Sequence, residues 1–69
     1  MDDQQIIIIR GDTVEIKAQG ETVTGTVISA SYSFLGKDWN IEFTDSTGTY
    51  RYWKQKQDGG TVRLLKKAG

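Results

Sequence analysis

The 69-residue sequence contains no cysteine and no histidine. Without cysteine there are no disulfides and no thiol chemistry, which fits a reducing cytoplasm. The lack of both residues excludes zinc sites built from Cys and His, and it excludes a histidine general base. A long apolar run is also missing, because only Ile6–Ile9 stand together after an acidic, polar start. A membrane span needs about 20 apolar residues, and a signal peptide needs a basic start, so we expect a cytoplasmic protein without membrane contact.

The length of the chain allows one domain at most. A domain this small buries only about 60% of its unfolded surface. Because disulfides and Cys/His zinc sites are ruled out, stability must come from a compact core, with oligomerisation as a further aid.

Charge is balanced overall but unevenly distributed. Residues 1–49 carry three basic and eight acidic residues, whereas residues 50–69 carry six basic residues and one acidic residue. Such asymmetry can mark an anion-binding face. Alternatively, the two halves neutralise each other across neighbouring strands of the fold, which is the interpretation we favour.

Alternation with a period of two dominates the first half of the chain. Val14, Ile16 and Ala18 alternate with polar residues and predict a half-buried strand. Gln19–Glu21 reads as a turn. The following segment, Thr22–Ser33, is rich in β-branched residues but too long for one straight strand, and Gly25 within it predicts a bend or bulge.

The second half contains the clearest strand and hairpin. Trp39, Ile41 and Phe43 alternate with polar residues, and Asp45–Gly48 has the composition of a tight hairpin loop. We predict further strands at residues 49–54 and 61–65, a turn at 58–60 and a single helical or 3₁₀ turn at 54–57. An amphipathic helix pattern is absent, so the fold class is all-β.

Ile6–Ile9 favour an extended conformation with apolar side chains on both faces. They predict an extra edge strand that bends at Gly11, or a segment that pairs with a second copy of the chain. We therefore divide the chain into an N-terminal extension or edge strand (1–10), the main domain (11–65) and a flexible tail (66–69).

Two short motifs resemble the opening of KOW-like, Tudor-like and other SH3-like small barrels. These are Gly11-Asp12 with Val14, and Gly25 with Val27, in the stretch GDTVEIKAQGETVTGTVISA. The resemblance implies a five-stranded SH3-like barrel over residues 11–65, similar to small bacterial or mobile-element domains of unknown function. The first loop is short and acidic where KOW motifs are glycine-rich and basic, and the opening lacks the Ala-Leu-Tyr-Asp-Tyr pattern of peptide-binding SH3 domains. The resemblance thus specifies architecture more than function.

Aromatic and basic residues alternate in the segment Tyr50–Lys56. Only one face of this strand can enter the core, so at least one large aromatic must lie near the surface beside Arg or Lys. That combination suits a protein interface or base stacking with phosphate contact, unless the aromatics only cap the barrel end. The predicted binding surface comprises Tyr32, Trp39, Tyr50, Arg51, Tyr52, Trp53, Lys54 and Lys56.

A second candidate contact is the apolar loop Phe34–Lys37. Exposed apolar loops often mark interaction sites. The alternative, which we favour, is that Phe34 folds back over the small core.

The acidic residues that flank the strand at 39–44 do not form a pair suited to catalysis, because such a pair needs a cleft. We therefore expect a non-enzymatic binding module without cofactor or metal. A protein partner is the first hypothesis, with self-association through Ile6, Ile7, Ile8 and Ile9 as one form of it. The alternative is nucleic-acid binding through Arg51, Lys54, Lys56, Arg63, Lys66 and Lys67, although zero net charge disfavours strong nonspecific binding to phosphates.

Overall fold

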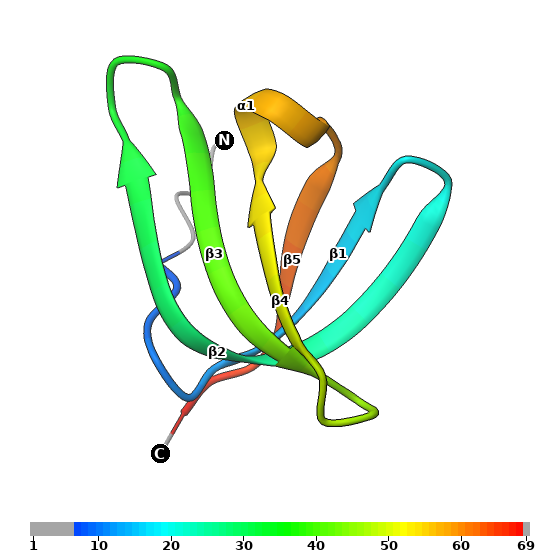
Figure 1. The fold of residues 1–69 in the computed structure, drawn as a ribbon. Coiled ribbons are helices and arrows are strands. Elements are labelled where there is room, and N and C mark those ends of the chain that lie inside the picture. The colour runs from blue at the N-terminus through cyan, green and yellow to red at the C-terminus, as the bar shows by residue number, and fades with distance from the viewer. Residues whose placement is uncertain (1–6, 69) are drawn as a thin grey trace.

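The computed structural model describes residues 7–68, and it confirms the all-β class. Five antiparallel strands form one sheet in the order β4-β3-β2-β1-β5 (Figure 1). The strands are β1 (Thr13–Ala18), β2 (Glu21–Ser33), β3 (Asp38–Asp45), β4 (Tyr50–Lys54) and β5 (Thr61–Lys66). One helical turn, α1 (Gln55–Asp58), connects β4 to β5, one residue later than predicted.

The turns follow the local chemistry of the sequence. Gln19 and Gly20 join β1 to β2, and both have positive φ angles, 52° and 77°. This is the geometry of a two-residue type I′ hairpin, whose twist matches the flanking strands. At the β3–β4 hairpin the Gly48 N–H donates to the Asp45 carbonyl at 2.9 Å, and Gly48 has a φ of 83°. Both predicted turns are therefore confirmed.

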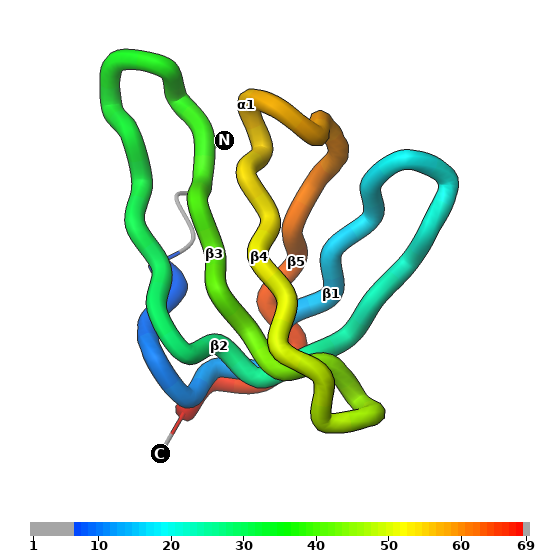
Figure 2. Tube along the Cα trace, viewed as in Figure 1, coloured from blue at the N-terminus to red at the C-terminus, as the bar shows by residue number. Residues whose placement is uncertain are grey.

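Strand β2 is long enough to serve both halves of the sheet (Figure 2). Its first part pairs with β1 and its second part with β3, and the register shifts between Val27 and Ser29. The sequence favoured a bend or bulge at Gly25, whereas the bulge lies three residues later. Gly25 has a different role, since a Cβ there would lie 2.4 Å from Cδ2 of Phe43 and 2.6 Å from the carbonyl oxygen of Thr44. Glycine is needed because β2 and β3 approach each other closely at this point.

The sheet does not close into a complete hydrogen-bonded barrel among the described strands. β4 and β5 are the two outer strands, and each pairs with only one neighbour. Side-chain hydrogen bonds hold β4 and α1 to the turn that precedes β5. The indole N–H of Trp53 donates to the Gly59 carbonyl, and the amide of Gln55 donates to the Gly60 carbonyl, both at 3.0 Å. Because β4 pairs with β3 alone, the other backbone edge of β4 has no strand beside it.

The core lies on the inner face of this bent sheet. Its buried members are Ile8, Val14, Ile16, Val27, Ile41, Phe43 and Trp53. The alternation predicted from the sequence places four of them correctly, in β1 and β3. Each such side chain contributes about 1.5–3 kcal/mol when it is removed from water, so this small set is the main source of stability.

The isoleucine segment behaves differently from the prediction. Within the described residues, 7–10 form no strand. Ile8 is buried in the core at 3% exposure, whereas Ile7 and Ile9 are 69% and 51% exposed; Ile6 lies outside the described residues. The buried side chain of Ile8 anchors the segment to the core, and the segment does not need to pair as an edge strand.

Asp12 joins the two ends of the chain. Its carboxylate is fully buried and accepts hydrogen bonds from the Ile9 N–H at 3.0 Å, the Ala68 N–H at 2.8 Å and the Lys67 ammonium at 3.1 Å. The bond from Ile9 is the largest of the effects that hold the pKa of Asp12 below its ordinary value, against the opposing effect of burial. The segment from Lys66 onward was expected to be a flexible tail. Instead, Lys66 ends β5 and the next two residues bind this carboxylate.

Candidate functional site: the open edge of strand β4

The alternation along β4 determines which side chains face outward. Trp53 is buried at 4% exposure and Arg51 is half-buried, so this pair faces inward. Tyr50 and Tyr52 lie on the opposite face and are 56% and 49% exposed. Lys54 shares their face and places its ammonium 5.3 Å from the centre of the Tyr52 ring. The sequence predicted that one face would remain at the surface, and the structure shows that it is the tyrosine face.

The structure does not bring the eight predicted binding residues into one surface. Tyr32 and Trp39 lie on the inner face of the β2–β3 hairpin, with ring centres 5.1 Å apart. Arg51 and Trp53 also point inward, from β4. Of the eight, four lie on the exterior beside the open edge of β4. These are Tyr50, Tyr52 and Lys54 on the outer face of β4, and Lys56 in α1.

Arg51 is fixed by carboxylates of the first half of the chain. Its Nε lies 2.8 Å from Oδ2 of Asp45, and its Nη1 lies 3.8 Å from Oε1 of Glu21. Asp45 also accepts hydrogen bonds from the hydroxyl and N–H of Thr47 and from the N–H of Thr49. The Thr47 hydroxyl makes the largest contribution among the effects that lower the pKa of Asp45 to about 2. Arg51 therefore contacts a partner that is ionised at neutral pH, and it is not available as an independent cation.

The other basic residues of the last third are partly neutralised in the same way. Arg63 lies 3.3 Å from Glu15 on the neighbouring strand, and Lys67 lies 3.1 Å from Asp12. With Arg51, three of the six proposed nucleic-acid contacts thus pair with acidic residues from the first half of the chain. The neutralisation between the two halves that the charge pattern favoured is present for these three, and it joins neighbouring strands at Arg51 and Arg63.

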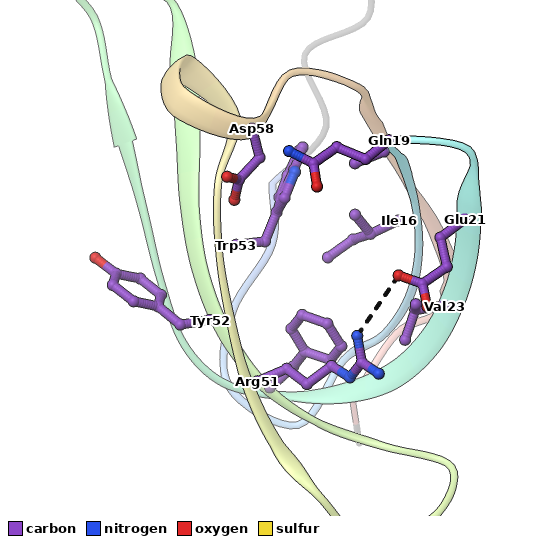
Figure 3. A pocket seen from close by; sticks show the side chains of 10 residues that line it. Ile16, Gln19, Glu21, Val23, Arg51, Tyr52, Trp53 and Asp58 are labelled. Atoms are coloured by element: carbon purple, nitrogen blue, oxygen red, sulfur yellow. Dashed lines mark ion pairs between the residues drawn. The ribbon is translucent and has the colours of Figure 1, made fainter.

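A partly open hollow lies between β4 and the β1–β2 hairpin, and we call it the seam pocket (Figure 3). Its volume is about 150 Å³. Apolar side chains from the inner faces of the strands form much of its wall, and charged side chains stand at its rim. The residues that line it are Ile16, Ala18, Gln19, Glu21, Val23, Phe43, Arg51, Tyr52, Trp53 and Asp58.

A wider depression lies on the other side of β4, and we call it the outer depression. It combines the exposed ring of Tyr52 with two ammonium groups, one carboxylate, two amides and a serine hydroxyl. Its residues are Ser33, Asp38, Asn40, Tyr52, Lys54, Lys56 and Gln57. β4 therefore separates two concave surfaces of different chemistry.

The tip of the β2–β3 hairpin is strongly apolar and exposed. Phe34 is 81% exposed and Leu35 is 99% exposed. The ring of Phe34 packs edge-on against Tyr32, with centres 5.2 Å apart, and does not reach the core. The favoured expectation that Phe34 covers the core is therefore wrong, because the core is already filled by residues of the strands. The alternative, an exposed apolar loop, is what the structure shows.

Three site residues were not found from the sequence. Glu21 and Asp58 were assigned only to turns, yet they stand on opposite sides of the seam pocket (Figure 3). Gln55 received no role, although its side chain accepts a hydrogen bond from the Trp39 N–H at 3.0 Å and also reaches Gly60. The contacts of Glu21 with Arg51 and of Gln55 with Trp39 join residues that are far apart in the chain, so no local pattern indicates them.

The chain matches no family model, and no curated protein or solved structure resembles it significantly. Among residues 7–68, no helix has the length and apolarity needed to cross a membrane. The same part of the chain contains no group of three or more acidic side chains placed to hold a metal ion.

Proposed function

We propose that the protein is a non-enzymatic module that binds a protein partner along strand β4. The observation that carries this proposal is the combination of an open backbone edge with exposed tyrosines on the same strand. An unpaired edge offers N–H and C=O groups to an extended partner segment, and the side chains beside it provide specificity. Tyrosine is also among the residues that contribute most to binding energy at protein interfaces.

The concave surfaces on either side of β4 support the same proposal. Side chains of an added strand point alternately to opposite faces. A segment beside β4 would therefore direct alternate side chains toward the seam pocket and the outer depression. We further propose that the domain is an SH3-like barrel left open at this edge, which agrees with its five-stranded antiparallel order.

Nucleic-acid binding is the second candidate, and the outer depression is the observation that favours it. Tyr52, Lys54 and Lys56 line one surface there, as stacking and phosphate contact require. Against it, Arg51 points to the other face and is paired with Asp45. The net charge of zero also provides little general attraction for phosphates.

A peptide-display selection against the intact chain tests the leading proposal. We expect selected peptides to bind the native chain and to lose about tenfold or more in affinity for the Y50S/Y52S variant, because two interface tyrosines are removed. The matched control is F34S/L35S, which removes two exposed apolar side chains from the distant hairpin tip and should leave affinity unchanged. Equal loss in both variants, or no selectable peptide, would contradict the proposal.

Titration with labelled single-stranded and duplex oligonucleotides at 50 and 200 mM salt examines the alternative. Binding that weakens steeply with salt and disappears in the K54E/K56E variant would favour nucleic acid over protein as the partner. The protein-binding proposal predicts no saturable oligonucleotide binding at either salt concentration.

A further inference from the structure

The charges around the seam pocket are unbalanced. Glu21 and Asp58 stand at its rim, and Arg51 is the cation that faces them. The Arg51 guanidinium, however, is already held by Asp45 at 2.8 Å, and the Asp45 side chain is only 8% exposed. The lining of the pocket thus holds two carboxylates and one guanidinium, which leaves an excess of one negative charge.

The link between Arg51 and Glu21 is loose. The two atoms are 3.8 Å apart, and the Glu21 side chain is 64% exposed. An exposed pair at this distance contributes about 1 kcal/mol or less. Glu21 is therefore free to turn toward an incoming cation at little cost, while Arg51 keeps its stronger partner.

Below the charged rim the pocket is apolar. Ile16, Val23 and the Trp53 indole form its walls (Figure 3). The Trp53 ring is held in place by its N–H bond to the Gly59 carbonyl. Apolar walls beneath an acidic rim match a side chain with a methylene stem and a positive head, because such side chains bury the stem and keep the charge at the surface.

We propose that the seam pocket receives a lysine or arginine side chain from the partner segment. This inference rests on the proposed protein-binding function, since it names the chemistry of one partner side chain. The stem lies against Ile16, Val23 and Trp53, and the ammonium or guanidinium lies between Glu21 and Asp58. The charge excess excludes an acidic side chain from the same position, because like charges would face each other in a partly enclosed space.

Small probes test this inference without a known partner. The native chain is titrated with n-butylguanidinium, n-butylammonium, butyramide and butyrate while two-dimensional NMR spectra record backbone amides and the Trp53 indole N–H. We expect saturable shifts at the Trp53 indole and at Gln19 and Glu21 with the two cations. We expect weaker shifts with butyramide and none with butyrate.

Charge-removing variants identify the rim residues. E21Q/D58N should bind the cations about fivefold to twentyfold more weakly, as expected for the loss of two exposed charge pairs, while its weak response to butyramide stays unchanged. The matched control is D38N, which removes a carboxylate from the outer depression and should bind the cations as the native chain does. Both variants are checked for an unchanged fold by thermal unfolding.

The two proposals fail separately. If the cations give no saturable shift, or butyrate binds as well as they do, the inference about the pocket is overturned even when selected peptides bind at β4. If the cations bind in the seam pocket but no peptide is selected, the pocket assignment stands and the proposed function is contradicted. A selected peptide set without lysine or arginine would also overturn the pocket assignment.

Discussion

At the scale of single residues, the two carboxylates with lowered pKa values determine how the fold responds to acid. Asp45 and Asp12 each accept several hydrogen bonds, and in both the folded chain favours the ionised form. Between the unfolded and folded pKa values the folded protein binds fewer protons than the unfolded chain. The stabilisation from these groups is therefore complete above the unfolded pKa and is lost as pH falls through the folded pKa.

We predict that stability is nearly constant from pH 7 to about pH 5 and falls steeply between about pH 4 and pH 2. The upper bound is set by ordinary carboxyl pKa values, and the lower bound by the value of about 2 for Asp45. Urea unfolding at a series of pH values measures this directly. D45N should flatten the profile in that range, and an unchanged profile in D45N would show that Asp45 does not have the role assigned to it.

Gly25 is the second residue whose role can be measured. A Cβ at this position would meet the Thr44 carbonyl oxygen at 2.6 Å and the Phe43 ring. The backbone contact can be relieved only by moving two paired strands, so G25A should destabilise by about 1–3 kcal/mol. That corresponds to a fall in Tm of roughly 5–20 °C for a domain of this size. T26A, one residue away on the exposed face, should change the free energy of unfolding by less than about 0.5 kcal/mol.

At the scale of structural elements, the described segments before β1 and after β5 pack with the strands. Ala68 and Lys67 reach Asp12 across more than fifty residues of sequence, and Ile8 fills part of the core. Residues outside the predicted 11–65 domain thus contribute to its packing. Their contacts give the protein more stability than the strands alone would provide.

We predict that truncation after Lys66 lowers Tm by about 10 °C, since it removes two of the hydrogen-bond donors to a buried carboxylate. Thermal unfolding followed by circular dichroism checks this. K66Q, which keeps the chain length and changes an exposed side chain, is the control and should unfold near the native temperature. A truncated chain with native Tm would favour the flexible tail that the sequence predicted for residues 66–69.

The sequence predicted the strands and turns better than the pairing between strands. The Gln19-Gly20 and Asp45–Gly48 turns were identified because their conformations depend on residues within the turn itself. The bulge near Ile28 was misplaced because Gly25 is an obvious backbone signal, whereas the bulge depends on pairing with β3. In the site, alternation showed that Tyr50 and Tyr52 share a face. It did not show which face is buried, because that depends on how the rest of the core is filled.

At the scale of the whole molecule, we propose that self-association through the isoleucine segment would use the isoleucines that are exposed. Ile8 is buried in the core, so within residues 7–9 Ile7 and Ile9 are the isoleucines exposed to a second copy. We predict that I7S/I9S unfolds at the native denaturant concentration and sediments as a monomer at all concentrations. Sedimentation velocity compares it with the native chain, which should show a faster, concentration-dependent species if this segment mediates association. Identical profiles would remove that role from the segment.

The central claim is that a partner segment binds along the open edge of β4. Hydrogen exchange of a complex with a selected peptide, read by NMR, tests it most directly. We predict strong slowing of the backbone amides of Tyr50–Lys54 that face the open edge, with cross-strand contacts between the peptide and β4. Protection confined to the β2–β3 hairpin tip, or unchanged exchange along β4 in a saturated complex, would contradict the account.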